Sequence, residues 1–162
     1  PSSSPATGKY TTAIVIKPTV LGTFGFYMST DDTWSGAQTE YVTPSNGNDL
    51  FSGTEHAHDQ RISKSLIASA LYAEINTQIG TSTTEDITLR TGPEDALVDT
   101  LLTCQFSDGS GETCSDTTAS HKALLKSGEF ISISTVPSAT DPPNKDLRVS
   151  IAVKLRRMFI VD

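Results

Sequence analysis

The sequence predicts an all-β fold, an antiparallel jelly-roll β-sandwich preceded by a short flexible N-terminal arm. The segment Leu147–Leu155 (LRVSIAVKL) alternates aliphatic side chains with smaller or charged ones, which is the pattern of a strand with one buried face. Clusters of Gly, Ser, Thr, Asn and Pro separate short β-branched segments, as in sandwiches and barrels. In a chain of 162 residues we expect one domain over residues 10–162 and a polar arm over Pro1–Lys9.

The N-terminal half alternates predicted strands with polar loops. Three segments are predicted as strands because β-branched or alternating aromatic residues dominate them: Tyr10–Lys17 (YTTAIVIK), Thr23–Ser29 (TFGFYMS) and Gln38–Thr43. The loop Thr30–Ala37 has Trp34 at its centre. The connection Pro44–Asp59 is rich in turn-forming residues and long for a compact domain, which indicates a candidate functional loop.

The segment Arg61–Ile79 (RISKSLIASALYAEINTQI) fits two periodicities. A helix would bring to one face Ile62, Leu66, Ala70 and Ala73. A strand would bring to one face Ile67, Leu71, Ala73 and Ile75. Its length and its Ala and Ser content favour a helix, but the β patterns around it favour a strand, and we predict a strand.

The C-terminal half carries the strongest strand patterns. Four segments are predicted as strands because aliphatic residues recur in them at strand spacing: Asp86–Thr91, Ala96–Phe106, Glu129–Val136 and Leu147–Leu155. In the third of these, Ile131 and Ile133 alternate with serines, so the serines are expected on the opposite face. The connection Pro137–Lys145 holds three of the eight prolines, which indicates a loop.

Cys104 and Cys114 are the only cysteines, and the residues between them (QFSDGSGET) have the composition of a turn. A hairpin would bring the two sulfurs together, so we predict a disulfide rather than two free thiols. Closing so short a loop stabilises a fold by about 2–3 kcal/mol when the geometry is relaxed. A disulfide implies oxidising surroundings, such as those of a secreted protein or a virion surface.

The charge balance excludes some partners. Lys and Arg number 12 against 19 Asp and Glu, a formal charge of −7, whereas nucleic acids and anionic membranes are bound by clustered positive charge. No apolar run approaches the ~20 residues that span a bilayer, so a soluble mature protein is expected. Pro1 could follow a removed initiator Met, and we favour this over a cleaved leader peptide.

Catalytic and cofactor signatures are missing from the sequence. It has no Gly-x-Ser-x-Gly elbow, phosphate loop or dinucleotide fingerprint, so we expect neither an enzyme nor a bound cofactor. His56 and His58 could begin a zinc site with His121 or a nearby carboxylate as third ligand, or they could be ordinary loop histidines. A further alternative is that histidines stacked around a trimer axis make assembly sensitive to pH. Three carboxylates near the glycine-rich turn lack the calcium-binding EF-hand spacing and favour a plain polar turn: Asp108, Glu112 and Asp116.

The C-terminal half resembles a known family. Four motifs follow one another in the order found in that family, with a polar hairpin and a Pro-rich loop between them: DITLRT (86–91), LVDTLLTCQF (97–106), SGEFISI (127–133) and LRVSIAVKL (147–155). They resemble the jelly-roll domains of complement globular heads and tumour necrosis factor, relatives of which occur at phage fibre tips and in virion surface proteins. The resemblance covers Arg61–Leu155. It implies trimers displayed on a surface and carries over no catalytic residue.

Several residues are candidates for contacts outside the chain. Basic residues concentrate near the C-terminus and either face solvent or contact an acidic neighbouring copy: Arg148, Lys154, Arg156 and Arg157. Phe159 lies in the apolar tail MFIV, which we expect to be buried in its own sheet or against another copy. Trp34 and Phe51 lie in loops, where an exposed aromatic could stack on a sugar ring and a buried one would fill the core.

We therefore expect a non-enzymatic virion structural protein: a capsid decoration, spike or fibre component that assembles with itself and with other virion proteins on the particle surface. A disulfide beside an N-terminus that is compatible with no secretion signal fits a protein that is made in a cytoplasm and oxidised after release. Two alternatives stay open. One is a receptor- or carbohydrate-binding jelly roll that recognises a host-surface glycan, and the other is a subunit of a secreted extracellular filament.

Overall fold

The computed structural model describes residues 23–30, 38–44, 47–49, 51–80, 82–108, 111–138 and 146–155. Some predictions of the sequence fall outside these ranges: Pro1–Lys9, Tyr10–Lys17, Trp34, Arg156, Arg157 and Phe159. Within them, no helix is long and apolar enough to cross a membrane.

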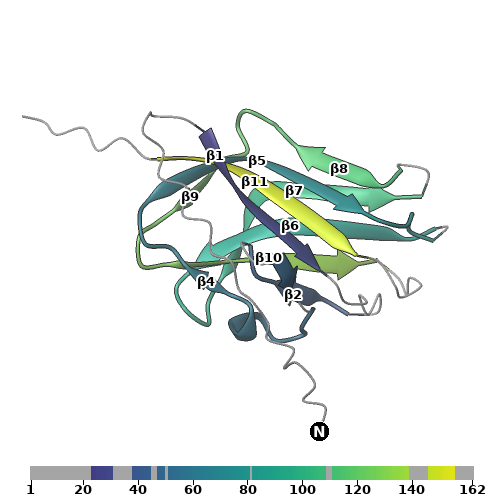
Figure 1. Ribbon diagram of the computed structural model, residues 1–162, viewed down its shortest axis with the longest axis horizontal. Helices are drawn as coiled ribbons and strands as arrows, with labels where there is room; N and C mark the ends of the chain where they lie inside the picture. The colour runs from purple at the N-terminus through teal and green to yellow at the C-terminus, as the bar shows by residue number, and fades with distance from the viewer. Residues whose placement is uncertain are drawn as a thin grey trace, which may run out of the picture.

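The first of two sheets, which we call sheet A, has six strands in the order β3-β1-β11-β5-β8, with β9 also paired to β5. Its pairs are antiparallel except for the short parallel contact between β1 and β3. In chain order its strands are β1 (Thr23–Thr30), β3 (Gly47–Asp49), β5 (Leu66–Ile75), β8 (Thr113–Asp116), β9 (Ala123–Leu125) and β11 (Leu147–Leu155). Figure 1 shows β1, β11 and β5 side by side.

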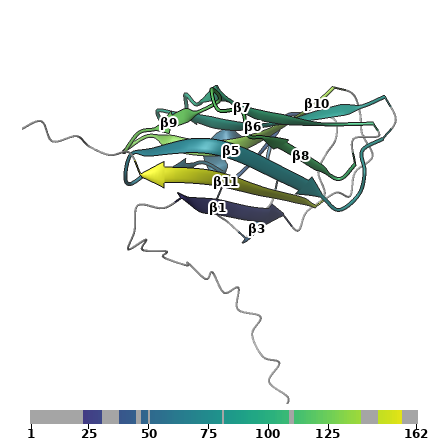
Figure 2. The same cartoon turned by 90° about the horizontal axis from the view of Figure 1, so that it is seen from above.

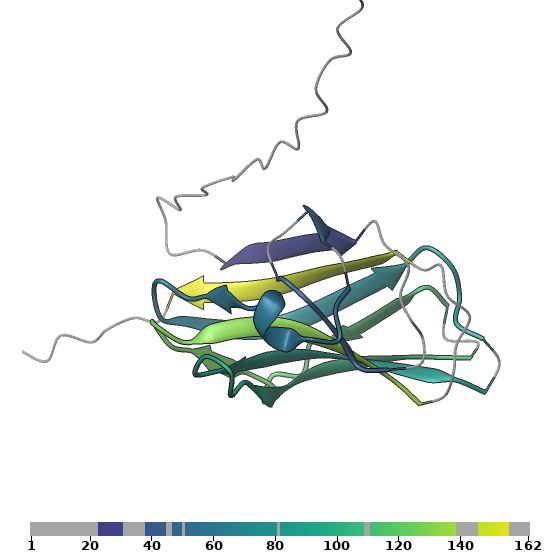
Figure 3. The same cartoon turned by 90° about the horizontal axis from the view of Figure 1, so that it is seen from below.

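The second sheet, sheet B, has five strands in the order β2-β10-β6-β7, with β4 also paired to β10. Its pairs are antiparallel. Its strands are β2 (Glu40–Val42), β4 (Gln60–Arg61), β6 (Thr84–Gly92), β7 (Val98–Ser107) and β10 (Phe130–Pro137). Figure 2 shows the two sheets as separate layers, and Figure 3 shows the one 3-10 helical turn of the described chain, η1 (Glu55–Ala57), in front of β10.

The core lies between the two sheets, so the predicted all-β antiparallel sandwich is confirmed. The largest fully buried side chains come from both layers: Met28, Leu71, Ile75, Ile87, Leu89, Leu102, Phe106, Leu125, Ile131, Ile133 and Leu147. Burying one such side chain contributes about 1.5–3 kcal/mol. The predicted alternation of β11 is confirmed up to Val153, and Leu155 is 37% exposed where the strand ends.

The ambiguous segment Arg61–Ile79 contains the strand β5, so the strand prediction is confirmed over Leu66–Ile75. Ala68 pairs with Val153 and Ala70 with Ala152, which leaves Ser69 between them as the extra residue of a β-bulge. The bulge shifts the inward set by one residue, from Leu66 and Ala68 to positions 71, 73 and 75. Ile67, predicted on the buried face, is therefore only half-buried.

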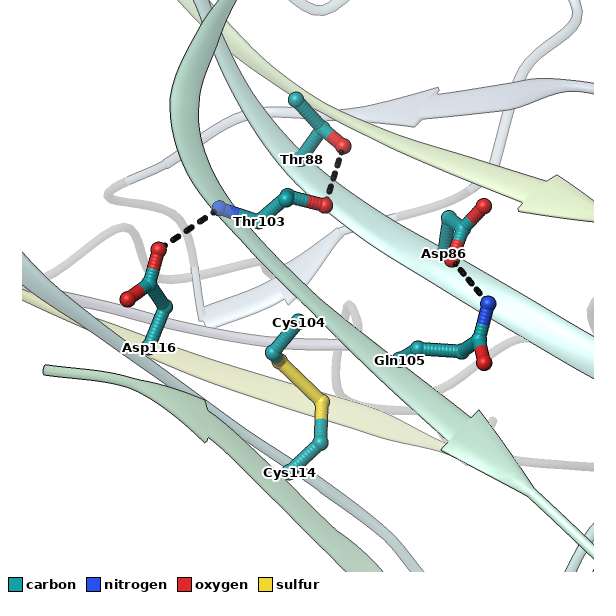
Figure 4. Close-up of a disulfide and its surroundings, with 7 residues drawn as sticks. All are labelled: Asp86, Thr88, Thr103, Cys104, Gln105, Cys114 and Asp116. Carbon is teal, nitrogen blue, oxygen red and sulfur yellow. Dashed lines mark hydrogen bonds between the residues drawn. A yellow bond between two sulfur atoms is a disulfide. The ribbon is translucent and has the colours of Figure 1, made fainter. Parts of the chain in front are cut away.

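Cys104 and Cys114 form the predicted disulfide, with 5.6 Å between their Cα atoms. The predicted hairpin is wrong, because β7 pairs with β6 whereas β8 pairs with β5 in the other sheet. The disulfide therefore joins an edge strand of sheet B to an edge strand of sheet A (Figure 4). Around it, Thr88 and Thr103 share a hydrogen bond of 2.9 Å, and Gln105 donates one of 2.8 Å to Asp86.

Candidate functional site

The outer face of sheet A carries a row of side chains that crosses four strands. Tyr27 of β1 is opposite Ser150 of β11, Ser150 is opposite Tyr72 of β5, and Tyr72 is opposite Ser115 of β8. Because the inward positions of these strands alternate with the outward ones, all four side chains are on the solvent side. The register thus places two tyrosines on either side of one small residue.

The two tyrosines form the walls of a shallow cleft. Tyr27 is 58% exposed and Tyr72 is 47% exposed, which is unusual for large side chains in the middle of a sheet. The cleft has a volume of about 380 Å³, and Ser150, Ser115, Arg148 and Glu74 contribute to its lining. It therefore offers two aromatic surfaces and several hydroxyl and charged groups to a molecule outside the chain.

Arg148, predicted as an assembly residue, lies at one end of this cleft. It donates from Nη1 to Oε1 of Glu74 over 3.3 Å, and both side chains are about half exposed. Such an exposed pair contributes little to folding, so it leaves both groups available to an incoming partner. Lys154, the other predicted assembly residue in the described chain, is exposed on the same face of β11 and is opposite the half-buried Ile67.

The outer face of sheet B is different because the segment Phe51–Asp59 crosses it. Glu55 of η1 accepts hydrogen bonds at Oε1 from Nε of Arg90 (2.7 Å) and from the hydroxyl of Ser132. Arg90 also donates to the carbonyl oxygen of Leu97 (2.7 Å), pairs with Asp99, and lies 5.7 Å from the centre of the Tyr41 ring. The polar side chains of this face thus bind one another.

Burial alone would lower the pKa of the Arg90 guanidinium, but the hydrogen bond and the charge of Glu55 raise this pKa above its ordinary value. Arg90 is therefore held as a fixed cation that anchors the crossing segment.

The two histidines of the predicted metal pair lie at η1. Nδ1 of His56 is 3.1 Å from Oδ1 of Asp95 and 3.5 Å from Oδ2 of Asp59, and His58 follows at the end of the helical turn. Across the described part of the chain, no three His, Cys, Asp or Glu side chains are arranged to hold a metal ion. Within these residues, the structure therefore places no third ligand with His56 and His58 for a metal site.

His121, one of the two alternatives for a third ligand, contacts Asp116, whose side chain is buried. Asp116 accepts hydrogen bonds from Nδ1 of His121 (2.8 Å), from the backbone nitrogen of Thr118 (3.0 Å) and from that of Thr103 (3.4 Å). These hydrogen bonds use both carboxylate oxygens of Asp116.

Phe51, a candidate for sugar stacking, is half-buried and packs against the core, so it does not present an exposed ring. Among the residues whose burial is described, the exposed large aromatics are Tyr27 and Tyr72, which sequence reasoning did not select. The sequence did contain a signal that Tyr27 faces outward, because Tyr27 alternates with the inward-facing Phe26 and Met28. For Tyr72 the signal was obscured by the bulge at Ser69.

Comparison of the chain with protein-family models, with curated proteins and with solved structures finds no significant match.

Proposed function

We propose that this protein is a non-enzymatic structural component of a virion surface that assembles with copies of itself through the outer face of sheet A. The observation that carries the proposal is the pair of exposed tyrosines, Tyr27 and Tyr72, on a face with few charges. Protein–protein interfaces are enriched in aromatic side chains and depleted of charge at their centre.

The composition of this face supports a contact between flat surfaces. The charged side chains described there are Arg148, Glu74 and Lys154, in a chain whose formal charge is −7. Around the tyrosines the outward side chains are small, so that another surface can approach the backbone closely: Gly25, Ser150, Ala152 and Ser115. On sheet B the polar side chains of Glu55, Arg90 and Ser132 already bind one another, so these groups offer less to a partner.

The sequence resemblance to complement-head and tumour-necrosis-factor jelly rolls supports a closed trimer, and the two-sheet sandwich is compatible with that family. The disulfide fits an extracellular or virion-surface location. Partners would be copies of this chain and other virion proteins, whereas nucleic acid and membranes are disfavoured by the net negative charge.

Light scattering of the purified protein tests the proposal. We expect a trimer mass for the wild type and a monomer mass for Tyr72→Glu, because a carboxylate buried in the interface would lose its hydration. Leu101→Glu is the matched control, since Leu101 is 61% exposed on β7 of sheet B, and it should keep the wild-type mass. A monomeric wild type, or equal dissociation by both substitutions, would contradict the proposal. A mass that rises steadily with concentration would indicate a filament subunit.

A second candidate function, carbohydrate binding, is favoured by the cleft itself. A space of about 380 Å³ between two tyrosines, with hydroxyls and the Arg148–Glu74 pair at its edge, has the residue types that stack on and hydrogen-bond to a sugar ring. Glycan binding that disappears in both Tyr27→Ala and Tyr72→Ala, without a change in light-scattering mass, would support it. Glycan binding by neither the wild type nor any variant would exclude it.

A further inference from the structure

The short edge strand β8 forms one wall of the tyrosine cleft. Thr113, Cys114 and Ser115 all contribute to the lining of the cleft, and Ser115 is opposite Tyr72 in the sheet. Within the described chain, β8 has four residues and pairs with β5 alone. Because main-chain pairing on one side holds so short a strand only weakly, the shape of this wall depends on what else ties β8 to the sandwich.

The end of β8 is tied to the sandwich by hydrogen bonds of the buried Asp116. This carboxylate accepts one from the imidazole of His121 (2.8 Å) and one from the backbone nitrogen of Thr103 (3.4 Å), which lies in β7 of sheet B. It accepts another from the backbone nitrogen of Thr118 (3.0 Å). These contacts hold the end of the strand without help from the disulfide.

The start of β8 is tied to sheet B by the disulfide. Thr113 and Cys114 pair with β5, and just before the strand the carbonyl oxygen of Glu112 accepts a hydrogen bond of 2.9 Å from the backbone nitrogen of Ile75. The disulfide then joins Cys114 to Cys104, whose side chain is only 7% exposed in β7 (Figure 4). It therefore anchors in the core the part of β8 that lines the cleft.

The two cysteines differ in their access to solvent. Cys114 is half-buried and contributes to the lining of the cleft, whereas Cys104 is buried, so an attacking thiolate meets the sulfur of Cys114 first. With a dithiol reductant, this thiolate bonds to Sγ of Cys114, the disulfide breaks, and Cys104 leaves as a thiolate that takes up a proton. The second thiol of the reductant then displaces Cys114, so the reductant becomes a disulfide and the chain gains two thiols.

We propose that the Cys104–Cys114 disulfide is a redox-controlled support of the tyrosine cleft, which is complete only while the disulfide is formed. Reduction leaves the Asp116 end of β8 in place and frees its start, so the cleft loses the wall made by Thr113, Cys114 and Ser115. The inference rests on the proposed function, because the face that reduction disrupts is the one proposed to bind other copies. It keeps copies apart in a reducing compartment and lets them assemble in oxidising surroundings.

Hydrogen exchange on the full chain, with and without a dithiol reductant, tests this support. The amide of Ile75, bonded to Glu112, reports on the start of β8, and that of Thr103, bonded to Asp116, reports on its end. The amide of Ile133, in β10 between β2 and β6, reports on global stability. We expect reduction to lower the protection factor of Ile75 about ten-fold more than that of Ile133, because a freed strand exchanges without global unfolding. Thr103 should lose no more protection than Ile133, and an equal loss at Ile75 and Ile133 would overturn the proposal.

Light scattering on the same samples tests the consequence for assembly. The oxidised protein should have the trimer mass and the reduced protein the monomer mass, and re-oxidation with oxidised glutathione should restore the trimer. A reduced protein that keeps the trimer mass would overturn the proposal. A monomeric oxidised protein would contradict the proposed function, and the comparison of Ile75 with Ile133 would then decide alone on the redox-controlled support.

The double variant Cys104→Ala/Cys114→Ala separates the disulfide from other effects of the reductant. Without reductant it should already show the low protection at Ile75 and the monomer mass, and wild-type protection at Ile75 would overturn the proposal. If this variant folds poorly, the reversibly reduced wild type carries the test. Gly92→Ala is the matched control, because it destabilises a turn of sheet B while the disulfide stays formed. It should lose protection equally at Ile75 and Ile133 and keep the trimer mass.

Discussion

Asp116 of β8 accepts a hydrogen bond of 2.8 Å from the imidazole of His121 while also accepting one from the backbone of Thr103 in β7. One buried carboxylate therefore connects the edges of both sheets, next to the disulfide between Cys104 and Cys114 (Figure 4). Burial raises the pKa of Asp116, but the hydrogen bonds from Thr118, His121 and Thr103 outweigh burial and hold this pKa below its ordinary value.

Replacing this carboxylate should lower stability and flatten its dependence on acid. A depressed folded-state pKa stabilises the fold above the unfolded-state pKa of ~3.9, and this stability is lost as the pH falls through the folded-state pKa. We expect Asp116→Asn to lower the free energy of unfolding at pH 7 by about 1–3 kcal/mol. In chemical denaturation between pH 7 and pH 2.5, the difference in free energy of unfolding between the wild type and Asp116→Asn should shrink as the pH approaches 2.5.

Asp108→Asn is the control for that experiment, because Asp108 is exposed. It should change stability by less than about 0.5 kcal/mol at each pH. An Asp116→Asn variant that keeps a constant difference from the wild type at all pH values would show that its effect is steric rather than electrostatic.

The disulfide should stabilise the sandwich by about 2–3 kcal/mol, because it closes a short loop in the unfolded chain. The loop is short because only ten positions separate Cys104 from Cys114. We expect the double variant Cys104→Ala/Cys114→Ala to unfold at correspondingly lower denaturant. Reductant should lower the free energy of unfolding of the wild type by the same amount and leave that of the double variant unchanged. A reductant effect on the double variant would contradict this account.

The turn after β6 requires glycine at position 92. A Cβ atom there would come within 2.7 Å of the carbonyl oxygen of Ala96 and 3.1 Å of the Cα of Leu97, both of them backbone atoms. Gly92→Ala should therefore lower the free energy of unfolding by about 1–3 kcal/mol in chemical denaturation, as overpacking does. Gly53→Ala is the control, because its nearest neighbour would be the side chain of Gln38 at an ordinary 3.6 Å. Equal stability of the two variants would show that the turn moves freely.

Local alternation predicted the strands that have one clear inner face. In β11 four aliphatic residues at alternate positions from Leu147 to Val153 are buried, and the residues between them are more exposed, so the nine-residue pattern describes most of the strand. In β10 the pattern predicted less. Ile131 and Ile133 are buried as expected, but Ser132 and Ser134 on the other face are buried too.

The burial of that serine face comes from long-range contacts. Ser132 is covered by Glu55, which is 77 residues away in the chain, and Ser134 is opposite Tyr41 of β2. The composition of Pro44–Asp59 predicts a loop, but it predicts neither the short strand β3 that pairs with β1 in sheet A nor the crossing of sheet B by Phe51–Asp59. The tyrosine cleft was missed for a similar reason, because it depends on the register of β1 and β5 against β11, which no local pattern records.

The bulge at Ser69 explains why β5 fitted a helix as well as a strand, and it leads to a deletion test. Removing Ser69 would leave Ala68 and Leu71 both inward in an unbroken alternation, so we expect this variant to fold and to lose no more than about 1–2 kcal/mol. Deleting Tyr72 instead would turn Glu74 toward the core, where a carboxylate costs several kcal/mol, and should prevent folding. Near-UV circular dichroism and denaturation distinguish the two outcomes. If both deletions unfold the protein alike, Ser69 is required by the strand and is not a removable insertion in it.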